Sequence, residues 1–210
     1  MGLLTLGTPL TWEEMKEWQQ HVKTHGVKQF IRTYHKHKED TGAPLKFGDE
    51  VEYSIFKLDH EEKTAKVSIR TAKLFELLSI PEKERNNRLE ELGESEIQPS
   101  TVAAVAAVAA LWRPEIAGFM LEGIPGEPYS GDINKMVEVE ENMKERRKMI
   151  EQVLEEGEMV ATLAMFPLIG APGFTAPFLA PDPENSLTKS LFFPEEALYP
   201  HPRFAEKPSR

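Results

Sequence analysis

The chain has 210 residues, a formal net charge of −10 at pH 7, no cysteine and 40% apolar residues. This length and apolar content suffice for a hydrophobic core. The excess of acid argues against nucleic acid and against an anionic membrane surface as partners. Without cysteine the chain forms no disulfide and offers no thiol, which fits a reducing compartment such as the cytoplasm.

The first ten residues show no targeting signal. They lack a basic segment followed by a long apolar run, so we expect no secretory signal. The myristoylation pattern requires Ser or Thr at position 6, where this chain has Leu6. The longest apolar candidate, residues 102–112, is short and mostly alanine, so we expect no membrane-spanning helix.

Two helices are expected before residue 40. Thr11 and Glu14 have the spacing of a capping box, and apolar residues follow at helical spacing until Gly26, where we expect the first helix to end. A second helix is expected over residues 27–38, before the break at residues 41–44.

A β-hairpin is expected next. It has a strand over residues 50–58, a polar turn over residues 59–62 and a second strand through Val67 and Ile69. A short apolar helix is expected over residues 72–79.

An inserted loop and helix are expected over residues 80–111. Residues 80–100 are charged and poorly periodic, which predicts a surface loop. The alanine- and valine-rich stretch that follows Ser100 predicts a helix, because alanine favours helix and serine caps it.

The remaining elements complete an α+β fold, with an antiparallel sheet flanked by helices. We expect a strand over residues 119–124, a helix from the cap at Asp132 to about residue 156, and a strand over residues 159–166. Residues 167–210 form a proline-rich extended segment. If the chain is a fragment, the large aromatic side chains of this segment are expected to be exposed or only loosely packed and to cause self-association; they are Phe174, Phe178, Phe192 and Phe193.

The first acidic pair stands at the start of an apolar strand. Glu50 and Glu52 are two residues apart, and residues i and i+2 of a strand share a face. Burying two like charges side by side costs several kcal/mol unless a positive charge neutralises them. This face is therefore either solvated or ion-paired, or it holds a cation.

The second acidic pair is Glu115 and Glu122. They are seven residues apart, an odd number, so one unbroken strand would put them on opposite faces. Pro114 and the Ala117-Gly118 pair allow a bend that brings both to one site. Carboxylates without cysteine or paired histidine favour Mg²⁺ bound beside nucleotide phosphates over zinc. The alternative to a metal site is that these carboxylates are solvated or ion-paired.

Other motifs give weaker evidence of a function. The chain has no Walker A loop and no dinucleotide-binding glycine fingerprint. The run Glu145-Arg146-Arg147-Lys148 is typical of the solvated side of a helix, although its arginines are also able to reach a phosphate or carboxylate.

Five blocks of sequence resemble the eukaryotic glutamate–cysteine ligase catalytic subunit family, in the family's order and across nearly the whole chain. They are GDEVEY at 48–53, WRPE with MLEG.PG.PY within 112–129, VEENMKERR at 139–147, FP..G.PGFT at 166–175, and KSLFFPEEAL..HPRF at 189–204. The opening MGLLTLGTPL, with Trp12 and HV..HG at 21–26, is similar to the family's N-terminus as well.

The resemblance implies the N-terminal part of an enzyme related to glutamine synthetase, in which a curved antiparallel sheet forms a funnel. Such an enzyme uses ATP to join the γ-carboxylate of glutamate to the amine of cysteine, the first step of glutathione synthesis, through an acyl phosphate. It also implies a modifier subunit as a possible partner. In the family, the glutamates that match Glu50, Glu52, Glu115 and Glu122 surround Mg²⁺.

The chain also departs from the family. The family's catalytic chain is far longer. Ile116-Ala117-Gly118 stands where the family has Tyr-Gly-Ser, and Leu168 stands where the family has an arginine. The rival hypothesis is therefore a truncated, non-catalytic fragment or paralogue that acts only as a binding module.

Overall fold

The chain forms two structural units. The computed structural model describes residues 10–42, 44–92, 108–163, 165–186 and 188–200. One unit covers Leu3–Leu45 and the other contains Lys46–Arg210. Among the helices in these described ranges, none is both long enough and apolar enough to cross a membrane.

The smaller unit is built on one helix, α1 (Trp12–His37), and not on two. The capping box is confirmed: the backbone N–H of Glu14 donates to Thr11 Oγ1, and the backbone N–H of Thr11 donates to Glu14 Oε2 at 2.8 Å. The predicted end at Gly26 is wrong. A glycine inside a helix costs about 1 kcal/mol relative to alanine, whereas a break there would leave further backbone groups without partners.

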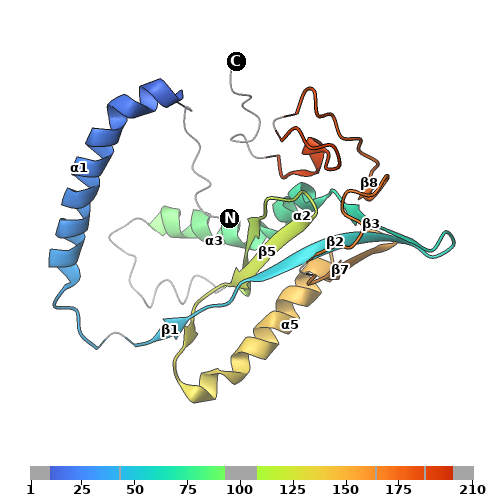
Figure 1. Cartoon of the computed structure of the whole chain (residues 1–210). Helices are drawn as coiled ribbons and strands as arrows, with labels where there is room; N and C mark the ends of the chain where they lie inside the picture. Colours follow the sequence, from blue (N-terminus) through green and yellow to red (C-terminus); the bar gives the residue numbers. More distant parts are fainter. Residues whose placement is uncertain (1–9, 43, 93–107, 164, 187, 201–210) are drawn as a thin grey trace. The chain divides into compact units, whose positions relative to one another are not determined.

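The larger unit contains a mixed sheet centred on β2 (Figure 1). Its strands are β2 (Val51–Asp59), β3 (Thr64–Ser68), β4 (Ala110–Pro114), β5 (Met120–Pro125), β7 (Glu158–Ala161) and β8 (Thr175–Ala176). β2 pairs antiparallel with β3, β5 and β7, and β4 pairs antiparallel with β5. β8 pairs parallel with β3. The predicted hairpin is therefore confirmed, and the sheet is antiparallel except at β8.

Two short strands form a separate two-stranded sheet. β1 (Lys46–Phe47) pairs antiparallel with β6 (Tyr129–Ser130). This pairing ties the segment that leads into β2 to the segment that leaves β5.

One face of β2 packs against helices. Tyr53 and Ile55 point to α2 (Thr71–Leu78) and α5 (Val137–Glu151), and α5 runs along the sheet in Figure 1. The buried residues of this cluster are Tyr53, Ile55, Leu74, Leu78, Ala110, Trp112, Leu121, Ile150 and Val160. The predicted helix after Asp132 begins as a 3₁₀ turn over Ile133–Lys135, capped by Asp132, and α5 ends at Glu151.

The opposite face of β2 carries a second core. Phe56 packs in a cluster of buried residues that also contains Val67, Ala117, Phe119, Phe166 and Phe174. Phe193 packs against this cluster, whereas Phe178 and Phe192 are 68% and 67% exposed. The prediction of exposure is confirmed for those two residues and wrong for Phe174, which is 4% exposed. Self-association stays a prediction.

The segment after α2 differs from its prediction. Residues 80–92 form a helix, α3 (Ile80–Leu92), where a surface loop was predicted. Its sequence has no apolar stripe, so periodicity gave no signal, but Glu, Lys and Arg are good helix formers. Glu82 ties the start of α3 to β4 through a two-bond ion pair with Arg113. The helix predicted after Ser100 falls mostly outside the described residues, and β4 begins at Ala110.

Gly126 supports a specific prediction about stability. A Cβ at this position would lie 1.7 Å from the carbonyl oxygen of Val108. Because that neighbour is backbone, it cannot rotate away, so we expect Gly126→Ala to destabilise the fold by about 1–3 kcal/mol through overpacking. Urea denaturation of the chain measures this loss.

The matched control is Gly26→Ala. A Cβ at Gly26 would have no atom within 4 Å, so the same substitution should raise the helix content measured by circular dichroism and leave the urea midpoint at or above that of the parent. Equal destabilisation by both changes would contradict the packing assigned to Gly126.

Candidate functional site

A row of three charged residues crosses the sheet. Glu52 on β2 is directly opposite Glu122 on β5, and Glu122 is directly opposite Arg113 on β4. Opposed residues of antiparallel strands point to the same face, with Cβ atoms about 4.5–5.5 Å apart. Glu52 is exposed and Glu122 is buried. The row therefore runs from the solvated side of β2 into the interior.

Glu50 lies just before β2, and its side chain is exposed. Its negative charge acts on Glu122 and raises the pKa of the Glu122 carboxyl. The predicted strand included Glu50, whereas β2 begins at Val51, so the shared face of Glu50 and Glu52 stays a prediction.

Glu115 lies in the turn between β4 and β5, where the chain reverses direction. β4 ends at Pro114 and β5 starts at Met120, so the two strands form a hairpin and not one bent strand. The side chains of Glu115 and Glu122 share a hydrogen bond. In the turn, a Cβ on Gly118 would lie 3.1 Å from the carbonyl oxygen of Ala197, so glycine allows this close approach.

The two hydrogen-bonded carboxyls have opposite pKa shifts. Burial raises the pKa of Glu122, and the hydrogen bond with Glu115 and the charge of Glu50 raise it further. Burial also raises the pKa of Glu115, but hydrogen bonds, including those from Glu122 and the backbone N–H of Ile116, outweigh this and lower it. Each of these two carboxyls therefore changes the pKa of the other.

Arg113 is in the same row, but its guanidinium is directed to another acid. It donates to both oxygens of Glu82 on α3, at 2.7 and 2.8 Å, and to the backbone carbonyl of Trp112 at 2.6 Å. The bonds to Glu82 are the main reason why the pKa of Arg113 is raised, with a smaller contribution from the charge of Glu122.

The donor chemistry of these carboxylates fits a hard cation. Within the described residues, no group of three or more His, Asp or Glu side chains is close enough together to hold a metal ion. Glu52 and Glu122 are at facing positions of β2 and β5, and the Glu115 and Glu122 carboxyls each change the pKa of the other. Mg²⁺ typically keeps several waters and uses one or two carboxylates together with substrate phosphates, which is compatible with pairs.

A buried ion pair lies next to the carboxylates. Arg146 on α5 is 0% exposed and pairs with Asp49, with 2.5 Å between Nη2 and Oδ2. Its Nη1 donates to the carbonyl oxygen of Gly123 at 2.5 Å. The interpretation of this run as a solvated helix side is therefore wrong for Arg146 and correct for Lys148, whose side chain is 67% exposed.

Sequence reasoning missed Asp49 and Arg146 as partners. One signal was available: Arg146 is spaced by three and four residues from Met143 and Ile150, which belong to the apolar stripe of α5. A charged residue in that stripe indicates a buried partner. Nothing in the sequence identifies Asp49 as that partner, because the two residues are 97 positions apart.

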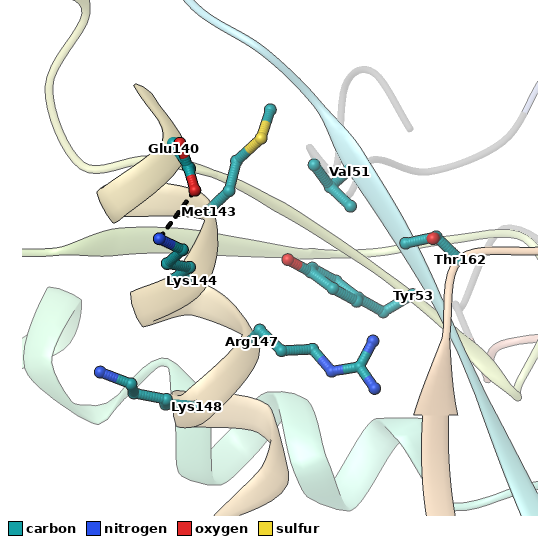
Figure 2. Close-up of a pocket in the computed structure, with 8 residues that line it drawn as sticks. All are labelled: Val51, Tyr53, Glu140, Met143, Lys144, Arg147, Lys148 and Thr162. Atoms are coloured by element: carbon teal, nitrogen blue, oxygen red, sulfur yellow. Dashed lines mark ion pairs between the residues drawn. The ribbon is translucent and has the colours of Figure 1, made fainter. Parts of the chain in front are cut away.

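A separate cavity of about 500 Å³ lies between α5 and β2 (Figure 2). Its lining side chains are Val51, Tyr53, Glu140, Met143, Lys144, Arg147, Lys148 and Thr162. Val51 and Tyr53 alternate with Glu50 and Glu52, so the cavity is on the opposite face of β2 from the carboxylates. Lys144 pairs with Glu140 at 2.7 Å and Arg147 with Glu151 at 2.7 Å. These cations already have acidic partners, so the cavity is a poor anion site.

Comparisons with known proteins agree on one family. The family model described as "Glutamate-cysteine ligase" matches residues 2–207. The chain is 42% identical over 206 residues to the human glutamate–cysteine ligase catalytic subunit, covering 98% of this chain and 29% of the human one. It is 40% identical over 205 residues to the rat catalytic subunit, covering 97% and 29%. It is 31% identical over 205 residues to the glutamate–cysteine ligase of Dictyostelium discoideum, covering 98% and 29%.

The chain thus spans less than a third of the length of these relatives, but the match covers almost all of its own residues. The matched region contains Glu50, Glu52, Glu115 and Glu122 and the Asp49–Arg146 pair. The chain belongs to the glutamate–cysteine ligase family.

Proposed function

We propose that this chain supplies the carboxylate half of the Mg²⁺ site of an ATP-dependent ligase. The ligase joins the γ-carboxylate of glutamate to the amine of cysteine, the first step of glutathione synthesis. The observation that carries the proposal is that Glu52 is directly opposite Glu122 in the sheet of a member of this family. Glu50 directly precedes β2, and Glu115 directly follows β4.

The proposed reaction has two steps. A γ-carboxylate oxygen of glutamate bonds to the γ-phosphorus of ATP, the bond to ADP breaks, and an acyl phosphate forms. The cysteine amine then bonds to the acyl carbon, phosphate leaves, and the amine loses a proton. When bound, Mg²⁺ would reduce the repulsion between the phosphates and the attacking carboxylate.

The roles of this chain's residues follow from their placement. Glu52 and Glu50, which are exposed, are the carboxylates open to a hydrated cation. Glu122 is buried behind them, opposite Glu52, and Glu115 and Glu122 each change the pKa of the other. We propose that the sheet around β2 is one wall of a funnel of the glutamine-synthetase kind.

A second candidate function rests on the exposed apolar surface. Phe178, Leu191 and Phe192 are each about two-thirds exposed, and soluble proteins rarely leave large side chains together in water without a partner. In this reading the chain is a non-catalytic binding module, whose partner is a modifier subunit or a second copy. For either function we propose a cytoplasmic location, because the chain has no cysteine.

The ligase assay separates these two functions. The chain is incubated with glutamate, cysteine, ATP and Mg²⁺, alone and together with the remaining part of the human catalytic subunit, and γ-glutamylcysteine and ADP are measured by mass spectrometry. We expect product in the complemented reaction and a loss of at least about 10-fold with Glu52→Gln, because that change removes a proposed metal ligand. Absence of product in both reactions would favour the binding module.

The metal proposal predicts the response of the chain to Mg²⁺. The double change Glu50→Gln/Glu52→Gln keeps the side-chain shape and removes two like charges, so the metal-free chain should melt at a higher temperature. The parent should gain about 2.7 kcal/mol of stability at a Mg²⁺ concentration 100 times its Kd, and the double variant should gain nothing. Thermal denaturation with and without Mg²⁺ measures both effects.

The control is Glu61→Gln/Glu62→Gln, which removes two adjacent exposed acids from the turn between β2 and β3. That variant should respond to Mg²⁺ like the parent. If the variant at Glu50 and Glu52 also responds like the parent, these two glutamates are not ligands in this chain.

The raised pKa of Glu122 predicts a pH dependence of folding. Between the ordinary value of 4.5 and the raised pKa, the folded state binds more protons at Glu122 than the unfolded state. The contribution of Glu122 to stability is therefore present below pH 4.5 and is lost as pH rises through the raised pKa. Glu122→Gln should make the chain more stable than the parent at pH 8 and change little at pH 4.

Urea denaturation of both proteins across this range measures the difference. Glu127→Gln, at an exposed glutamate two residues after the end of β5, serves as the control and should follow the parent at every pH. A variant at Glu122 that is no more stable than the parent at pH 8 would show that the carboxyl carries no penalty when ionised.

A further inference from the structure

We propose that Arg146, through Asp49, is a positioning residue that holds the two carboxylate-bearing strands in register at the metal site. The inference rests on the proposed function, because it concerns the geometry of the Mg²⁺ ligands. Asp49 and Arg146 lie on the side of the sheet that α5 covers, away from the proposed Mg²⁺ ligand Glu52.

One guanidinium bonds to both strands. Its Nη2 is 2.5 Å from Asp49 Oδ2, and Asp49 directly precedes Glu50. Its Nη1 is 2.5 Å from the carbonyl oxygen of Gly123, which directly follows Glu122. Arg146 therefore links the neighbours of one carboxylate from each strand, at the end of the β2–β5 pairing where Val51 is opposite Gly123.

The alternation of side chains explains why Arg146 does not touch the ligands. Asp49 lies on the side that α5 covers, where Arg146 binds it, whereas Glu52 alternates with Tyr53 and points to the other side. Arg146 comes from α5, which is on the covered side. It acts on the carboxylates only through the backbone that carries them, so it is not a catalytic residue.

The site needs such a link because its charges repel one another. Glu52 on β2 is directly opposite Glu122 on β5, and like charges at facing positions of two strands are destabilising. The segment from Gly48 to Glu50 is not part of β2, so strand pairing does not fix Glu50. The ion pair with Arg146 fixes the residue next to it.

The burial of Arg146 makes the link rigid. The residue is 0% exposed, and Ile150, one helical turn later, is also fully buried. Within the described residues, Asp49 Oδ1 and Arg146 Nε are buried and make no hydrogen bond. Because apolar side chains often replace a buried ion pair without loss of stability, stability alone does not account for an incompletely bonded pair, whereas positioning does.

The test uses the double variant Asp49→Asn/Arg146→Met in the 210-residue chain. Removing both charges avoids leaving one of them buried and unpaired, which is the reason why Arg146→Met alone is expected to unfold the protein. The probe is Mn²⁺, which shares the oxygen-ligand preference of Mg²⁺ and is counted by electron paramagnetic resonance. We expect a folded variant whose Mn²⁺ Kd is about 10–100-fold weaker, the effect seen when residues that orient metal ligands are changed.

The matched control is Lys148→Met. It removes one positive charge from the same helix at an exposed position whose ion pair with Glu145 is long, 3.8 Å. Its Mn²⁺ Kd should equal that of the parent, so a general change in charge is separated from a change in ligand geometry.

The outcomes are distinguishable. A parent chain that does not bind Mn²⁺ overturns the metal site and the positioning role together. A parent that binds Mn²⁺ and a folded double variant that binds it equally well overturn the positioning role alone. If the double variant does not fold, Arg146→Lys decides: it keeps the charge but presents a single point of attachment, so weaker Mn²⁺ binding supports the role and parent-like binding overturns it.

Discussion

Side chains alternate between the two faces of β2, and this alternation governs both the core and the candidate site. Tyr53 and Ile55 point into the cluster beneath α2 and α5, and Glu52 points to the opposite side. Because β2 pairs with β3, β5 and β7, its register fixes the faces of all three partners. A shift of one residue would put Glu52 into the apolar cluster and expose Tyr53.

The charged residues on the two faces of β2 are neutralised in different ways. On the covered side, Asp49, whose side chain is 20% exposed, neutralises the fully buried Arg146. On the other side, Glu52 is opposite Glu122, and the arginine of that row bonds to Glu82. Burial is the main reason why the pKa of Glu122 is raised, and the charge of Glu50 raises it further. A cation beside these carboxylates would favour their ionised form, which is the proposed connection between the fold and ligase chemistry.

Parts of the fold and site were predictable from local sequence. The capping box at Thr11, the hairpin through β2 and β3, and the apolar helix α2 follow from patterns within a few residues. The helix α3 was missed because its charged sequence has no stripe, and the end at Gly26 was wrong because one glycine is too small a cost to break a helix. Phe174 is buried because β8 pairs with β3, a contact about a hundred residues away in sequence.

The sequence by itself determined the family, through motifs in a fixed order, and the opposite faces of Glu52 and Tyr53, because successive side chains of a strand alternate. Only the tertiary structure decided how Glu115 comes near Glu122, since the hairpin between β4 and β5 depends on strand pairing and on the close approach at Gly118. It also decided that Asp49 and Arg146 are partners. Their contact joins residues 97 positions apart, and no local pattern encodes the docking of a helix onto a sheet.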